Sequence, residues 1–224
     1  MEYIKQAIHL FLSGDKELLQ IVRTTLTMSV FSTVISSVIG LPIGVALGRA
    51  EFKGKGIILR ITNTLMGLPP VAAGLIVFML FRSVGPLGSF RIMFSVRIMV
   101  VAQVLLITPV IMGLAASASN VKAKSLTETA KGIGIRPTGQ IYLLMRECAP
   151  QFVGIMLVGF GRSIAEVGAV SLVGGNIQFK TRVMTTAILL ETNKGNFDTA
   201  IALTMLLLLI SLVVNTLAYP YWRK

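Results

Sequence analysis

Two short runs in this sequence look like parts of chemical sites, and neither is complete. Gly174–Thr181 (GGNIQFKT) ends like a phosphate-binding loop, but Phe179 stands where that loop requires its second glycine. Gly161–Ala165 (GRSIA) resembles a nucleophile elbow loosely, because Ala165 replaces a glycine within an apolar run and no histidine is available as a base. We therefore predict no ATPase, protease or lipase site, and a chain that is not an enzyme.

Metal and redox chemistry have equally few candidates. The one histidine, His9, cannot build a metal site alone, and the one cysteine, Cys148, permits no internal disulfide. We expect no metal and no cofactor bound by this chain, with Cys148 as a bystander near the start of a helix.

One charged pair remains as a candidate for function. Arg162 and Glu166 lie near the middle of an apolar run, four residues apart, so a continuous helix would place them on one face. A charge at the centre of a bilayer costs about 2.5–3.5 kcal/mol or more, so such residues usually face the interior of a helix bundle. Two interpretations stay open: the pair stabilises the bundle, or Arg162 lines a route for an anion and Glu166 restrains it.

The composition explains why so little soluble chemistry is found. Of 224 residues, 54% are hydrophobic and only 13% are charged, whereas soluble domains carry about a quarter charged residues. With a mean hydropathy of +0.81, this predicts an integral membrane protein. The net charge of +12 would raise the question of nucleic acid in a soluble protein. Here we interpret it as basic loops at an anionic lipid surface and expect no nucleic-acid partner.

The hydropathy pattern predicts an all-α membrane protein with about five transmembrane helices. Residues 1–18 are expected to form a short amphipathic segment on the membrane, and residues 19–224 a single transmembrane domain. A polar segment covers about residues 118–150, and a polar loop is expected at 176–196. The predicted spans are about residues 19–47, 57–81, 92 or 98 to 116, 152–173 and 197–217.

Small residues and prolines mark positions inside these spans. Ser36, Gly40, Gly44 and Gly48 recur every four residues, which predicts a face where a second helix packs closely, unless the spacing is chance in a glycine-rich chain. Pro69 and Pro70 predict a bent second span, and Thr108-Pro109 is a second kink site. The bend at Pro69-Pro70 indicates either a helix at the transport pathway or a purely structural kink.

Charge counting orients the chain weakly. With five spans the termini lie on opposite sides, and one side then carries eleven lysines and arginines against nine on the other. Lysine and arginine prefer the cytoplasmic side. We expect the 118–150 segment and the C-terminus to be cytoplasmic and the N-terminus to lie outside.

The polar segment contains a short helical signal closed by glycine, Glu128–Gly134 (ETAKGIG). It resembles the cytoplasmic E-A-A-x-x-x-G loop of ABC importer permeases. Glu128, Ala130 and Gly134 match this motif, Thr129 replaces its second alanine, and Gly132 lies within it. The family's later I-x-L-P is missing, since Leu144, Arg146 and Glu147 stand there and the proline comes at Pro150.

A second signature is more specific. Arg162–Ala169 (RSIAEVGA), followed by VGGNI at 173–177, is similar to the fourth span of permeases for molybdate, tungstate and sulfate. With TRVMTTAI at 181–188 and ETNKGNF at 191–197, the chain most resembles the tungstate-type permease. The resemblance covers nearly the whole chain from Leu19 onward.

The resemblance implies a type I ABC importer arrangement of the MetI-like kind. Two copies of this chain would form the pore, and two copies of a separate ATP-binding subunit would dock on a short coupling helix at Glu128–Gly134. ATP and Mg²⁺ would be used by that subunit, and an extracellular or periplasmic binding protein would deliver the oxyanion. Molybdate or sulfate is the alternative cargo. A secondary transporter or channel is the alternative class, but it does not explain the polar segment.

Overall fold

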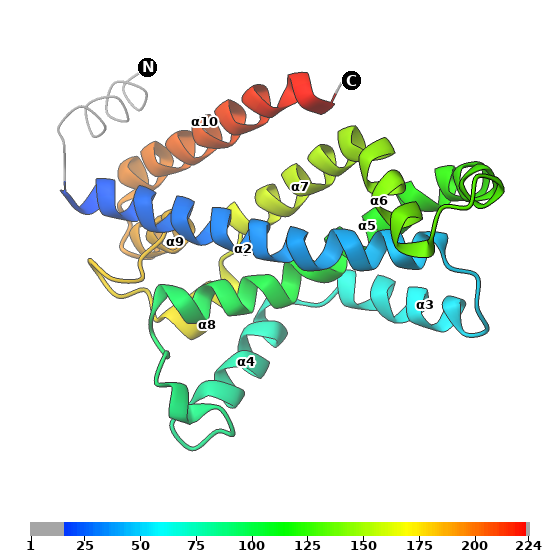
Figure 1. Cartoon of the computed structure of the whole chain (residues 1–224). Helices are drawn as coiled ribbons and strands as arrows, with labels where there is room; N and C mark the ends of the chain where they lie inside the picture. Colours follow the sequence, from blue (N-terminus) through cyan, green and yellow to red (C-terminus); the bar gives the residue numbers. More distant parts are fainter. Residues whose placement is uncertain (1–15, 223–224) are drawn as a thin grey trace. The chain divides into compact units, whose positions relative to one another are not determined.

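The computed structural model describes residues 16–222. The predicted amphipathic segment 1–18 therefore lies outside the described residues, apart from its last three, which begin the first described helix. All regular structure within 16–222 is helical (Figure 1). The helices are α2 (Lys16–Arg49), α3 (Lys55–Met66), α4 (Pro70–Phe81), the short 3₁₀ helix η1 (Gly88–Phe90), α5 (Val96–Gly132), α6 (Pro137–Glu147), α7 (Ala149–Ile164), α8 (Gly168–Gly174), α9 (Met184–Asn193) and α10 (Phe197–Trp222).

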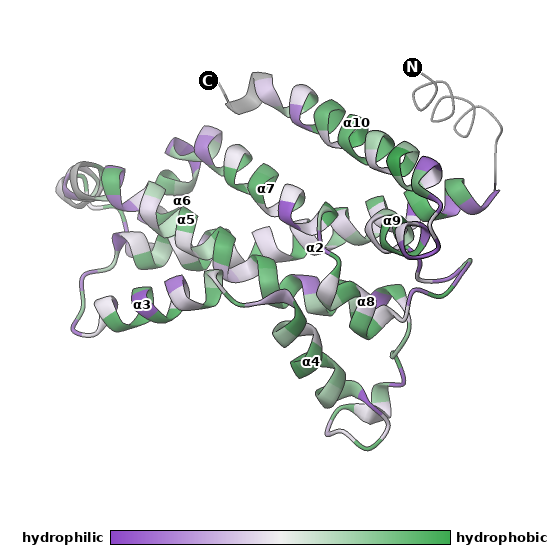
Figure 2. Cartoon of the chain, turned by 180° about the vertical axis from the view of Figure 1, so that it is seen from behind, coloured by the Kyte–Doolittle hydropathy of each residue, from purple (hydrophilic) through white to green (hydrophobic). Residues whose placement is uncertain are grey.

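The structure contains three to five candidate membrane spans, against about five predicted from the sequence. Three stretches are long and apolar enough to cross a bilayer, at Lys16–Arg49, Val96–Ala123 and Phe197–Tyr219. Two broken helix pairs, α3 with α4 and α6 with α7, raise the total to five if each pair makes one span. Figure 2 shows α4 and α10 as mainly hydrophobic. The prediction of an all-α membrane protein is confirmed.

Helix α2 buries serines in its middle part and exposes several of its large apolar residues there. Ser29, Ser32 and Ser36 are fully buried, whereas Phe31 and Val38 are 58% and 69% exposed. A soluble protein would show the opposite arrangement, because water drives large apolar groups inward. In lipid, small residues face neighbouring helices and large apolar residues face the acyl chains, so the exposure pattern of α2 indicates a membrane helix.

The predicted second span is two separate helices and not one bent helix. Helix α3 ends at Met66, and α4 begins at Pro70 with Pro69 in an extended conformation (φ −61°, ψ 128°). Proline lacks an N–H group and disfavours a helical conformation in the residue before it. The two consecutive prolines therefore lie at a break between helices, whereas the single Pro109 lies inside the continuous helix α5.

The predicted polar segment 118–150 is helical for most of its length, which corrects the expectation of a coupling loop with a separate short helix. Helix α5 continues through Pro109 and past the predicted end at residue 116 to Gly132. After a connector of residues 133–136, α6 begins with Pro137 at its first turn. The change to polar residues marks where the predicted apolar span ends, and it does not end the helix.

Two further expectations were wrong in the C-terminal third. The predicted span 152–173 divides into α7 and α8, with a break at residues 165–167. The predicted polar loop 176–196 contains helix α9, whose first four residues, Met184, Thr185, Thr186 and Ala187, are buried. The mean hydropathy of such a segment includes its polar residues, so it does not reveal the buried face of a short helix.

The chain divides into two compact units, which we describe separately. The first comprises residues up to 32, 69–103 and 161–217, and the second comprises 33–68, 104–160 and the residues from 218. In the first unit, α4 packs on α8, where a Cβ on Gly74 would lie 2.7 Å from the Ala169 Cα atom. A second contact in this unit joins α2, α9 and α10 through Leu18, Ile21, Met184, Ala187 and Leu203.

In the second unit, the C-terminal half of α2 packs directly on α5. A Cβ on Gly44 would lie 2.5 Å from the Met112 carbonyl oxygen, and one on Gly48 would lie 2.6 Å from the Ala116 carbonyl oxygen. Gly40 is slightly less crowded, at 3.0 Å from the Ile111 side chain. The core of this unit adds α6 and α7 through Leu41, Val45, Ile107, Ile111, Ala115, Leu144, Cys148 and Phe152.

The first prediction concerns this close approach. Gly44→Ala is expected to lower the midpoint of thermal unfolding in detergent, because the new methyl group meets backbone that cannot move aside, at a cost of about 1–3 kcal/mol. Gly56→Ala is the matched control, since Gly56 lies in helix α3 with nothing within 4 Å of its Cβ position. Alanine favours helix over glycine by about 1 kcal/mol, so the control should not destabilise. Equal midpoints for the two variants would contradict close α2–α5 packing.

Candidate functional site

The residues predicted to couple to an ATPase form the C-terminal end of α5. Gly134 adopts φ +75°, and the Ile135 N–H donates to the Ala130 carbonyl oxygen at 2.9 Å. This six-to-one hydrogen bond with a left-handed glycine is a Schellman motif, which closes helices where only glycine fits without strain. Glu128, Thr129 and Gly132 are exposed on the last turns, and Ala130 is buried.

The connector after this glycine is held by a buried amide. Gln140 of α6 is 2% exposed, and its Nε2 donates to the Ile135 carbonyl oxygen at 2.7 Å. Its Oε1 accepts hydrogen bonds from Arg49, the last residue of α2, at 3.1 Å from Nε and 2.6 Å from Nη2. The end of α2, the connector and α6 are thus joined at one end of the second unit (Figure 1).

Apolar side chains lie exposed on the same connector and helix. Ile133 is 71% exposed and Tyr142 is 66% exposed. On the far end of α6, Lys122 donates to the Glu147 carbonyl oxygen at 3.0 Å and pairs with its carboxylate at 3.3 Å. The connector and α6 therefore combine a backbone held by hydrogen bonds with exposed apolar side chains. The far end of α6 adds a charged pair.

Arg162 and Glu166 do not share a helical face, so that expectation was wrong. Helix α7 ends at Ile164, which leaves Arg162 in its last turn and Glu166 in the break before α8. The two residues form no ion pair within the described part of the chain. The physical reason is the break itself, because a spacing of four brings side chains together only in continuous helix.

Glu166 instead stabilises the break. Its buried carboxylate accepts a hydrogen bond from the Ala169 N–H at 3.0 Å, and its backbone carbonyl accepts one from the Thr185 hydroxyl at 2.8 Å. The first bond satisfies an N–H that the first turn of α8 would otherwise leave unpaired. Nearby, a Cβ on Gly168 would lie 2.8 Å from the Val71 side chain, which directly follows Pro69 and Pro70. The double proline thus starts α4 beside the break that Glu166 stabilises.

Arg162 lies next to a buried polar layer of the first unit. Its guanidinium is partly buried, and its Nε is buried with no partner among residues 16–222. Beside it, the Ser163 hydroxyl shares a hydrogen bond of 2.9 Å with Ser32, and the Gln103 amide donates to the Ser163 carbonyl oxygen at 3.0 Å. Arg162 therefore adds to this layer a buried N–H donor that has no hydrogen-bond partner among the described residues.

The run that resembles a phosphate-binding loop forms a closed turn. The Thr181 hydroxyl donates to the Gly174 carbonyl oxygen at 2.6 Å and accepts from the Ile177 N–H at 3.0 Å. Gly175 and Asn176 both have positive φ angles within this turn. The Ile177, Lys180 and Thr181 N–H groups are thus hydrogen-bonded within the turn and are not free to bind a phosphate.

A second turn joins α9 to α10. The Glu191 carboxylate accepts hydrogen bonds from Lys194 at 2.7 Å and Asn196 at 2.8 Å, beside Gly195 at φ +81°. The Lys194 hydrogen bond, and then that from Asn196, hold the pKa of Glu191 below its usual range. Glu191 therefore stays ionised at neutral pH and keeps this turn closed.

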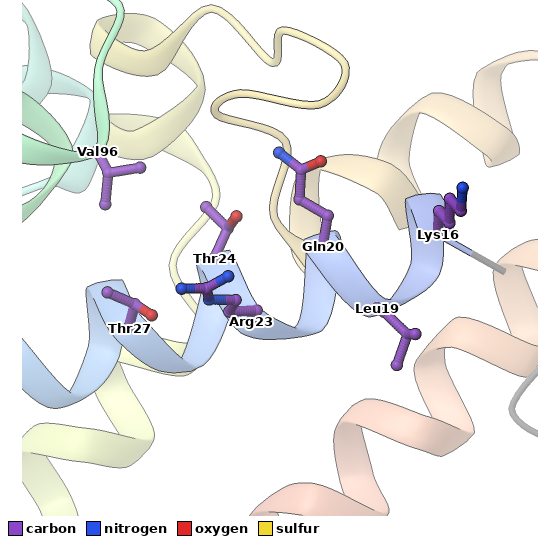
Figure 3. Close-up of a pocket in the computed structure, with 7 residues that line it drawn as sticks. All are labelled: Lys16, Leu19, Gln20, Arg23, Thr24, Thr27 and Val96. Carbon is purple, nitrogen blue, oxygen red and sulfur yellow. The ribbon is translucent and has the colours of Figure 1, made fainter. Parts of the chain in front are cut away.

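The first unit also holds an open cavity of about 540 Å³ (Figure 3). Six of its seven lining residues come from the first three turns of α2, and Val96 comes from the start of α5. Two of them are cationic, Lys16 and Arg23, and none is a carboxylate. Arg162 and Glu166 are not among the lining residues, so this cavity is separate from the charged pair that the sequence singled out.

Comparison with known proteins identifies the family. Residues 40–219 match the model of the binding-protein-dependent transport system inner membrane component. This chain belongs to that family. It is therefore a permease subunit of a transport system, an integral membrane protein and not an enzyme.

Three relatives match along almost their whole length. A probable anion ABC transporter permease of Haloferax volcanii is 38% identical, with 93% of each chain covered. The tungstate uptake system permease TupB of Campylobacter jejuni is 36% identical, covering 98% of this chain and 92% of the relative. TupB of Peptoclostridium acidaminophilum is 33% identical, with 98% of each chain covered. The family's name places its members in transport systems that depend on a binding protein.

Sequence reasoning missed the residues that join the end of α2 to the α5–α6 connector. Arg49 and Gln140 lie 91 positions apart, and neither carries a local signal that would pair them. In the sequence, Arg49 is one of several basic residues that follow the first apolar span. The available hint was a glutamine on a short amphipathic helix that follows a glycine stop, which is compatible with burial but does not name a partner.

The second prediction tests Glu166 as a hydrogen-bond acceptor. Glu166→Gln should keep the permease folded, because an amide oxygen can still accept from the Ala169 N–H. Glu166→Ala should destabilise it by about 0.5–2 kcal/mol, the usual cost of losing such a group at a helix start. Glu51→Ala is the control, since its ion pair with Lys55 is exposed and contributes little. Unfolding midpoints measure all three, and a Gln variant as unstable as the Ala variant would show that the charge itself is needed.

Proposed function

We propose that two copies of this permease form the pore of an ATP-driven importer for tungstate or a closely related oxyanion. The observation that carries the proposal is full-length similarity to two tungstate uptake permeases and an anion permease. Two copies of a separate ATP-binding subunit would drive the pore. A binding protein outside the membrane would deliver the oxyanion and supply most of the selectivity.

The coupling end is where we propose that the ATP-binding subunit docks. The last turns of α5, with Glu128 and Gly132, and the exposed Ile133 and Tyr142 offer it a mixed polar and apolar surface. The GGNIQFKT run is used in a closed turn. We therefore assign ATP and Mg²⁺ to the partner subunit.

We propose that this end faces the cytoplasm. The Arg49–Gln140 hydrogen bonds support this, because they bring the basic α2–α3 loop to the same end as the connector. Lysine and arginine are enriched in cytoplasmic loops. With five spans, the N-terminus would then lie outside and the C-terminus in the cytoplasm.

Arg162 is our candidate for a contact with the transported anion. Its guanidinium carries an unused donor beside the neutral Ser32, Gln103 and Ser163 layer. A single cation among neutral groups attracts a dianion without holding it so strongly that release becomes slow. Glu166 would act indirectly, since it stabilises the break next to Arg162 and does not neutralise it. Arg162→Ala should accordingly reduce uptake more than it reduces the yield of dimer.

The third prediction tests the function as a whole. Liposomes holding this permease, its ATP-binding subunit and its binding protein should accumulate tungstate only when ATP is supplied. Molybdate and sulfate, tested in parallel, show whether the cargo is one of these instead. Liposomes with the permease alone should accumulate none. Uphill uptake by the permease alone would make it a secondary transporter and would overturn the proposal.

The fourth prediction tests the coupling end. Gly134→Val should leave ATP hydrolysis but uncouple it from uptake, because a β-branched residue is strained at φ +75° and the end of α5 must rearrange. Gly134→Asn is the matched control, since asparagine tolerates this conformation. No atom lies within 4 Å of the Cβ position, so neither side chain is excluded by crowding. Normal uptake per ATP in the valine variant would contradict a coupling role for this turn.

A further inference from the structure

The Arg49, Gln140 and Ile135 hydrogen bonds join three elements that the sequence keeps far apart. We propose that Gln140 is a positioning residue that carries displacement of the α5–α6 connector into the C-terminal end of α2. The inference rests on the proposed function, because the displacement would come from a docked ATP-binding subunit. We call this set of hydrogen bonds the Gln140 link.

The geometry uses both ends of one buried amide. Oε1 accepts from two nitrogens of Arg49, at 3.1 and 2.6 Å, while Nε2 donates to the Ile135 carbonyl oxygen at 2.7 Å. If the amide were flipped, its NH₂ group would face the donors of Arg49, and its oxygen would face the Ile135 carbonyl oxygen. Only a side chain with one acceptor and one donor satisfies both neighbours at this buried position. Glutamate would satisfy the arginine alone, and leucine would satisfy neither.

The C-terminal end of α2 is packed tightly against neighbouring elements. A displacement that reaches Arg49 therefore moves this end of the helix and is not lost in a flexible segment. Gly48 lies against α5, where its Cβ position is 2.6 Å from the Ala116 carbonyl oxygen and 2.9 Å from the Ser119 Cβ. The Lys55 ammonium donates to the Gly48 carbonyl oxygen at 3.2 Å, which ties the start of α3 to the same point. Close packing of this kind transmits displacement instead of yielding to it.

The other tie between α5 and α6 is less suited to this role. Lys122 and Glu147 pair near the surface, with side chains 36% and 57% exposed. Water and salt weaken such a pair. The Gln140 link is shielded, since Gln140 is 2% exposed. It also reaches the connector directly, whereas the Lys122 pair lies at the opposite end of α6.

A set of variants separates transmission from simple support of the fold. Gln140→Leu removes both halves of the link, and Gln140→Glu keeps the Arg49 half while losing the donor to Ile135. Arg49→Lys keeps a charge that can still donate to Gln140. Arg49→Gln and Arg60→Gln make the same charge change, but the exposed Arg60 has no described side-chain partner, so Arg60→Gln is the matched control.

The test uses the complete importer in liposomes and measures tungstate uptake per ATP hydrolysed. Gln140→Leu and Arg49→Gln should lower this ratio about fivefold or more, the range expected when coupling between sites is lost. Basal hydrolysis and the yield of assembled complex should be kept. Gln140→Glu should fall between these variants and the wild type, and Arg49→Lys should recover most of the ratio. Arg60→Gln should match the wild type.

Hydrogen exchange on the same complexes gives a second readout that needs no transported substrate. In the wild type, nucleotide binding should change the protection of amides at residues 45–50. In Gln140→Leu this response should be lost, while the amides of residues 133–136 exchange faster. An unchanged uptake ratio, a fall in assembly as large as the fall in uptake, or a nucleotide response that persists in Gln140→Leu would each overturn the inference. If the wild type takes up no oxyanion, the proposed function fails, and the exchange data still decide on the link.

Discussion

Within a bilayer the backbone has no water to bond with, and this constraint bears on the helix breaks of the permease. Broken helix at membrane depth is tolerated only where protein or a water-filled cavity satisfies the freed groups. At the end of α3, the Gly67 and Leu68 N–H groups donate back to Thr64 and Leu65, both at 3.1 Å. At the α7–α8 break, Glu166 and Thr185 supply the missing partners. At each of these two breaks, nearby residues thus provide hydrogen bonds for backbone groups that the helix leaves unpaired.

The same constraint explains why small residues matter so much in α2. Lipid offers no hydrophobic gain for bringing helices together, so association depends on dispersion and on polar contacts at close range. Gly44 and Gly48 allow α5 to approach backbone to backbone. Ser32 and Thr25 add hydrogen bonds within the first unit, to Ser163 at 2.9 Å and from the Met184 N–H at 2.9 Å. In both units, α2 thus makes its contacts through small or hydroxyl-bearing residues.

Hydropathy and spacing were enough to predict the all-α class and the approximate position of α2 and α10. They could not predict where helices break or continue, because these events depend on partners distant in sequence. Helix α5 continues beyond residue 116 into a polar region, and α7 stops at Ile164 although its sequence has no proline there. The Arg162–Glu166 pairing failed for this reason: the spacing was correct, but the helix that would make it meaningful was absent.

The residues that carry the resemblance to oxyanion permeases turn out to stabilise turns of the first unit. Glu166 satisfies the start of α8, Thr181 closes the turn after it, and Glu191 closes the turn before α10. A motif built from such residues specifies how the helices are connected. Two of its arginines, Arg162 and Arg182, have a buried Nε with no hydrogen-bond partner among the described residues. Under the proposed function, the pore has only to pass a hydrated dianion. Discrimination among oxyanions of similar size would then belong to the binding protein, and the permease would contribute the movement between its two openings.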